Sequence, residues 1–133
     1  ALAAPLAGRL ADRIGTPRVA RWGIIVALAG FASLLLQAAL PPVLQLALLA
    51  LAAVVFDFGF QSALVSHQAL VYGLQPDARS RLNALLFTGV FVGMAVGGGL
   101  GAVALAQAGW MGVVLLACAT SALALWVRTR AET

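Results

Sequence analysis

The sequence contains little charge and no lysine. Eight arginines and four acidic residues make up 9% of its 133 residues, whereas soluble domains carry about 25% charged residues. Hydrophobic residues make up 63% of the chain, more than the core of a soluble domain this small can bury. The scarcity of charge therefore excludes an ordinary soluble domain and favours a protein that lies in a membrane.

Residues for covalent, metal and nucleotide chemistry are also scarce. The single cysteine, Cys118, has no partner for an intrachain disulfide, and no CxxC, HExxH or Walker-type phosphate loop is present. Ser62, Ser66 and His67 lie close together, but no nucleophile turn or oxyanion donor accompanies them. We therefore expect no enzyme, no cofactor and no metal. No aromatic residues are interleaved with the arginines, so we expect no nucleic-acid partner.

Four long apolar runs occupy most of the chain. A helix needs about 20 apolar residues to cross about 30 Å of hydrocarbon. We predict membrane-spanning helices at residues 20–40, 43–70, 82–105 and 110–127. The expected fold class is all-α, a polytopic membrane helix bundle with the lipid bilayer as its surroundings.

The arginines lie only in alternate connections between these runs. They form three clusters: Arg9, Arg13, Arg18 and Arg21; Arg79 and Arg81; Arg128 and Arg130. The connections around residues 41–42 and 107–110 carry no charge. The positive-inside rule therefore predicts a multi-pass protein with its C-terminus and the tail 131–133 in the cytoplasm. The lysine-free composition, rich in Ala, Leu, Gly and Arg, favours a bacterial source and hence the bacterial inner membrane.

One acidic residue, Asp57, lies near the middle of the second apolar run. A carboxylate at that depth is costly, so it should face a cavity, contact a polar partner or carry a proton. At 100° per residue, Gln61 lies about 40° and Gln68 about 20° from Asp57 around the helix. These three residues form a polar stripe, which we interpret as the lining of a proton or substrate path. An interhelical hydrogen-bond network that only holds the bundle is the alternative.

Two apolar runs carry small residues at helical spacing, which let helices approach closely in lipid. In the first run they are Gly23, Ala27 and Gly30. In the third run, glycines recur every four residues and are predicted to form a packing face: Gly89, Gly93, Gly97 and Gly101.

A polar segment precedes the first run and has the sequence GRLADRIG over residues 8–15. It resembles the G-x-L-a-D-r-x-G signature of the major facilitator superfamily. The resemblance implies a cytoplasmic gating loop formed by Gly8, Asp12, Arg13 and Gly15. The basic pair that usually follows this signature is replaced by Thr16 and Pro17.

A second stretch, from Asp57 to Asn83, is similar to drug- and metabolite-efflux members of the same superfamily. In it the usual Asn-Gln-Ala-Arg reads His67-Gln68-Ala69-Leu70. The resemblance also marks part of the next cytoplasmic loop, namely Arg79, Arg81 and Asn83.

These resemblances imply the C-terminal part of the major facilitator fold, about its last four helices. Residues 1–19 would be the end of a preceding helix and the signature loop, and an N-terminal half would precede Ala1 as a partner. The implied function is secondary transport of a small-molecule substrate, as proton-coupled efflux by alternating access. The alternatives are a complete four-helix multidrug exporter acting as a dimer and a non-transporting membrane scaffold subunit.

Overall fold

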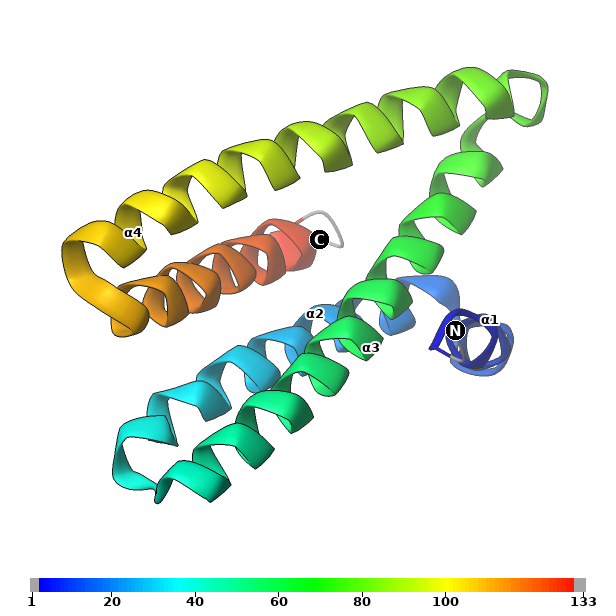
Figure 1. Ribbon diagram of the computed structural model, residues 1–133. Coiled ribbons are helices and arrows are strands. Elements are labelled where there is room, and N and C mark those ends of the chain that lie inside the picture. Colours follow the sequence, from blue (N-terminus) through cyan, green and yellow to red (C-terminus); the bar gives the residue numbers. More distant parts are fainter. Residues whose placement is uncertain (1–2, 131–133) are drawn as a thin grey trace.

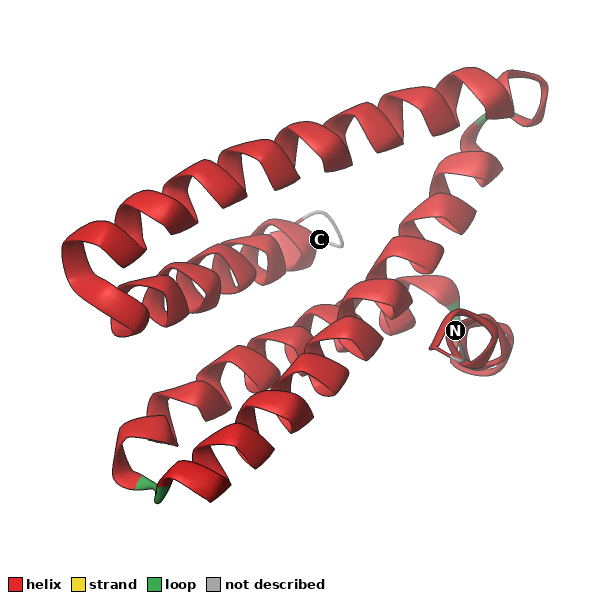
Figure 2. Ribbon diagram, viewed as in Figure 1, coloured by secondary structure: helices red, strands yellow, loops and turns green. Residues whose placement is uncertain are grey.

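The computed structural model describes residues 3–130, and these residues are almost entirely helical (Figures 1 and 2). The predicted tail at 131–133 lies outside them. No β-strand occurs within residues 3–130, so the all-α prediction is confirmed. The helices are α1 (Ala3–Ile14), α2 (Thr16–Ser33) with a 3-10 continuation (Leu34–Ala39), α3 (Pro42–Leu74), a short 3-10 turn (Pro76–Ala78) and α4 (Arg79–Arg130).

Glycine and proline set the ends of these helices. Gly15 separates α1 from α2 with φ of 91°, which a residue without Cβ adopts at little cost. Pro41 is extended and is followed by Pro42 at the first position of α3, where the absent N–H costs no hydrogen bond. At the other end of α3, Gln75 is extended because Pro76 follows it.

Helix α1 is longer than its sequence suggested, because residues 8–14 were predicted as a loop. The structure continues the helix to Ile14 and confines the change of direction to Gly15. The segment is polar, but Ala, Leu and Arg are all strong helix formers. In Figure 1, α1 is seen nearly end-on and runs across the direction of α2 and α3.

Helix α4 reverses direction at Gly109, where φ is 64° and ψ is −160°. Figure 1 shows the two segments running antiparallel as a hairpin, the first green to yellow and the second orange to red. The reversal falls within the turn that the sequence indicated between the third and fourth apolar runs. Residues 79–108 form the first segment and residues 110–130 the second.

Helices α2 and α3 make the closest contact in the described chain. A Cβ added at Gly23 would lie 2.6 Å from the Gly59 carbonyl oxygen, and one at Gly59 would lie 2.6 Å from the Ala27 backbone nitrogen. A Cβ added at Gly30 would lie 3.2 Å from the Phe56 backbone nitrogen and 3.3 Å from the Ala52 carbonyl oxygen, which is a less tight approach. The prediction that Gly23, Ala27 and Gly30 form a packing face is confirmed, and the sequence did not identify Gly59 as its counterpart.

The buried core is small. Leu34, Ala52 and Val114 form one cluster, and Phe31, Leu48 and Cys118 pack against it. Three helices within residues 3–130 are long and apolar enough to cross a membrane, namely α2 with its 3-10 continuation, α3 and α4. A small core surrounded by exposed apolar side chains suits a bundle whose outer surface meets lipid.

Candidate functional site

The predicted polar stripe lies on the face of α3 that points away from α2. Asp57 is exposed, and Gln61 and Gln68 are half-buried. Gly59, which touches α2, is about 160° around the helix from Asp57. The stripe therefore lies on the side of α3 opposite α2, where Asp57 is open and the two amide side chains are partly covered by the described chain.

An aromatic cluster borders one flank of this stripe. The rings of Phe56 and Phe60 lie 5.9 Å apart on α3, and Phe56 also packs against Phe31 of α2 at 4.7 Å. Tilted aromatic pairs at such distances stabilise packing beyond the area that they bury. The contact between Phe31 and Phe56 adds to the packing of α3 against α2.

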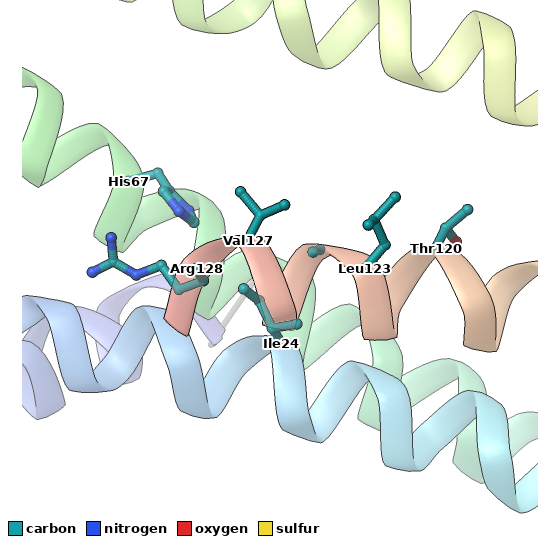
Figure 3. Close-up of a pocket in the computed structure, with 7 residues that line it drawn as sticks. Ile24, His67, Thr120, Leu123, Val127 and Arg128 are labelled. Atoms are coloured by element: carbon teal, nitrogen blue, oxygen red, sulfur yellow. The ribbon is translucent and has the colours of Figure 1, made fainter. Parts of the chain in front are cut away.

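His67 lies on the same flank, nearer the C-terminal end of α3. Its Nδ1 is 2.8 Å from the Ala63 carbonyl oxygen. Because a carbonyl only accepts, this contact makes Nδ1 the donor and fixes the tautomer. The ring lines a cavity that it shares with Arg128 of α4 (Figure 3).

The turn between α3 and α4 is held by one side-chain hydrogen bond. The Tyr72 hydroxyl donates to the Asn83 Oδ1 at 2.6 Å. Asn83 belongs to the predicted cytoplasmic loop, in which Arg79 and Arg81 are exposed. The bond ties the last part of α3 to the first part of α4 and so restricts the angle between them.

The predicted gating residues lie at the end of α1. Asp12 and Arg13 are exposed there, Gly8 is half-buried, and Gly15 forms the turn into α2. An exposed acid beside an exposed base is available to a partner outside the described chain, as a gate contact requires.

The predicted glycine face of α4 makes no contact in the described chain. No heavy atom outside its own local helix lies within 4 Å of a Cβ built at any of its four glycines. Residues 91–100 are all exposed. If this face packs against another helix, as predicted, that helix is not among residues 3–130.

Sequence reasoning missed the features that join distant parts of the chain. Periodicity within one helix does not show that Tyr72 meets Asn83, or that His67 shares a cavity with Arg128. Among the described residues, no group of three or more His, Cys, Asp or Glu side chains could hold a metal ion.

Comparison with known proteins places the chain in a family. The model of the Major Facilitator Superfamily matches residues 1–133. The chain is 39% identical over 61 residues to the uncharacterized transporter YgaY of Escherichia coli O157:H7 and to its counterpart in strain K12. That stretch covers 46% of this chain but only 16% of each relative. No solved structure matches significantly.

The chain therefore belongs to the major facilitator superfamily, as the signature at residues 8–15 indicated. With its three long apolar helices, it is part of a multi-pass membrane protein.

Proposed function

We propose that this chain takes part in secondary active transport of a small solute, as proton-coupled efflux by alternating access. The observation that carries the proposal is an exposed carboxylate with two half-buried amides on one face of an apolar helix, in a chain of the major facilitator superfamily. Asp57 would bind the proton or a polar group of the solute, and Gln61 and Gln68 would line the path.

The arrangement of α3 supports this role for Asp57. Its opposite face is locked against α2 through Gly59, so the stripe is held in one direction rather than rotating in the bundle. A membrane carboxylate that alternates between a proton and a solute couples the two movements. The relatives' description as transporters agrees with this interpretation.

The two alternatives explain less. A complete four-helix exporter acting as a dimer would not account for the match to the major facilitator family over residues 1–133. A scaffold subunit has no need of the stripe at Asp57, Gln61 and Gln68. We further propose that an N-terminal half forms the other wall of the path, and that Asp12 and Arg13 latch the inner side against it.

The test uses inside-out membrane vesicles that contain the full-length protein and hold a pH gradient reported by a fluorescent dye. Ethidium, organic acids and sugars are added one at a time. A coupled exporter lets at least one of these solutes dissipate the gradient faster than in vesicles without the protein. If none of a broad panel does so, proton-coupled efflux is wrong.

Membrane orientation gives a prediction of its own. We propose that the arginine-rich ends of the helices face the cytoplasm, within the bacterial inner membrane. In intact cells, a membrane-impermeant thiol reagent should label Gln107→Cys and leave Arg79→Cys unlabelled, both introduced into a Cys118→Ala background. Both positions are exposed, so burial does not explain a difference between them. Labelling of Arg79→Cys alone would reverse the orientation.

The glycine face of α4 gives another prediction. Gly93→Leu and Gly97→Leu should abolish transport while the protein still inserts, because leucine prevents close approach by another helix. The control is Leu100→Ala on the same exposed segment, which leaves the glycines intact. Transport and membrane content are measured in the same vesicles. Near-normal transport in both glycine variants would show that this face meets lipid only.

A further inference from the structure

A cavity of about 520 Å³ lies between three helices near the end of the chain (Figure 3). Helix α2 contributes Ile24 and α3 contributes His67. The remaining walls come from one face of the second segment of α4, at Thr120, Leu123, Ala124, Val127 and Arg128. These positions recur every three or four residues, so the cavity follows the helix for about 12 Å.

The two ends of this cavity differ in chemistry. Figure 3 shows His67 and Arg128 together at one end, with Leu123 and Thr120 toward the other. Leu123 and Val127 are 59% and 54% exposed. The apolar part is therefore open along the outer surface of the bundle, while the basic end lies close to the last turn of α4.

The basic end pairs an imidazole with a guanidinium. The Nδ1 of His67 donates to the Ala63 carbonyl oxygen at 2.8 Å. The other ring nitrogen, Nε2, is not used in this hydrogen bond to α3. In the neutral ring this Nε2 is an acceptor that suits a hydroxyl group. Arg128 is half-buried and makes another contact within the chain. Its guanidinium has five N–H donors in a planar fork, which matches phosphate oxygens.

We propose that this cavity binds an anionic phospholipid with a hydroxylated headgroup, of the phosphatidylglycerol type. Arg128 contacts the phosphate, His67 accepts from a headgroup hydroxyl, and the glycerol and upper acyl chain lie along Leu123 and Val127. Basic pockets between membrane helices bind such headgroups. This site is separate from the stripe at Asp57 and does not depend on transport.

The position of the cavity favours a lipid over a soluble anion. Arg128 lies two residues before the end of α4, in the arginine cluster that includes Arg130. A helix end with basic residues is at the depth of lipid phosphates. A small soluble anion would use the basic end alone, whereas an exposed apolar wall about 12 Å long matches the glycerol and acyl part of a lipid.

The test measures lipid retained by the detergent-solubilised full-length protein, using native mass spectrometry. Phosphatidylglycerol and phosphatidylcholine are the two lipids added. We expect phosphatidylglycerol to bind at one saturable site, and Arg128→Gln to weaken it by about tenfold or more. Arg130→Gln is the matched control, because Arg130 lies over the Trp126 ring at 4.8 Å and does not line the cavity. It should change binding by less than about twofold.

Two further variants keep the test decisive if Arg128→Gln fails to fold. His67→Leu should weaken phosphatidylglycerol severalfold with little effect on phosphatidylcholine. Leu123→Gln should also weaken it, since it places a polar group on the apolar wall, while excess inorganic phosphate should not displace the lipid.

Three results would overturn the proposal. Equal losses in Arg128→Gln and Arg130→Gln would mean general attraction to basic residues. Displacement by inorganic phosphate with no effect of Leu123→Gln would mean a site for a free anion. Equal retention of both lipids would mean an apolar groove without headgroup recognition.

Discussion

Asp57→Asn should abolish accumulation driven by a pH gradient while the protein still inserts in the membrane. Asparagine keeps the size of the side chain and removes the group that takes up and releases a proton. With one proton exchanged per solute, a gradient of about one pH unit supports about tenfold accumulation in the wild type, and the variant should show none. The measurement is uptake of a transported solute into inside-out vesicles, with exchange at equal pH recorded alongside.

Gln61→Ala and Gln68→Ala serve as the matched controls, because they lie on the same stripe and carry no proton. Each should shift the apparent affinity for the solute and keep the dependence on the gradient. Uphill transport at the wild-type rate in Asp57→Asn would mean that Asp57 is structural, and that coupling depends on residues elsewhere in the transporter.

Gly59→Leu should cause the largest loss of stability of any substitution considered. Its Cβ would meet the Gly23 carbonyl oxygen and the Ala27 nitrogen at 2.6 Å, and both atoms are backbone. Neither helix can turn a side chain away, so α2 and α3 must separate. Overpacking a core costs about 1–3 kcal/mol when side chains can adjust, and the cost here should reach or exceed that range.

The measurement is the temperature at which half of the detergent-solubilised protein is lost from the folded peak in size-exclusion chromatography. Gly59→Leu should lower it by about 5 °C or more. Gly73→Leu is the control, since no heavy atom outside its own local helix lies within 4 Å of a Cβ built at Gly73. An equal drop in both variants would show that the loss reflects glycine in a helix rather than contact with α2.

The local sequence predicts those features of the fold that depend on a single helix, such as its position along the chain and its packing face. The apolar runs and the prolines at 41 and 42 placed α2, α3 and α4, and small-residue spacing identified the face of α2 that touches α3. The end of α1 differs from the expectation, because the family resemblance implied a loop over this polar segment and the structure continues the helix to Ile14. Polarity reports exposure, whereas the backbone conformation of residues 8–14 follows their high helix propensity.

The site is less accessible to such reasoning. Helical periodicity placed Asp57, Gln61 and Gln68 on one face but could not say that this face looks away from α2, since that depends on Gly59 meeting Gly23. The bond from Tyr72 to Asn83 depends on how the chain turns between α3 and α4. Contacts between distant segments follow from packing, which single-helix patterns do not encode.

Helix α3 is longer than the hydrocarbon layer of a membrane is thick. Its 33 residues extend about 50 Å. Membrane helices tilt by up to about 40°, at which α3 would still span about 38 Å of a hydrocarbon layer about 30 Å deep. At least one helical turn must therefore leave the hydrocarbon, and the end with His67, Gln68 and Tyr72 is the polar one. A thicker bilayer would draw that turn inward, so hydrophobic mismatch acts directly on the depth of Asp57.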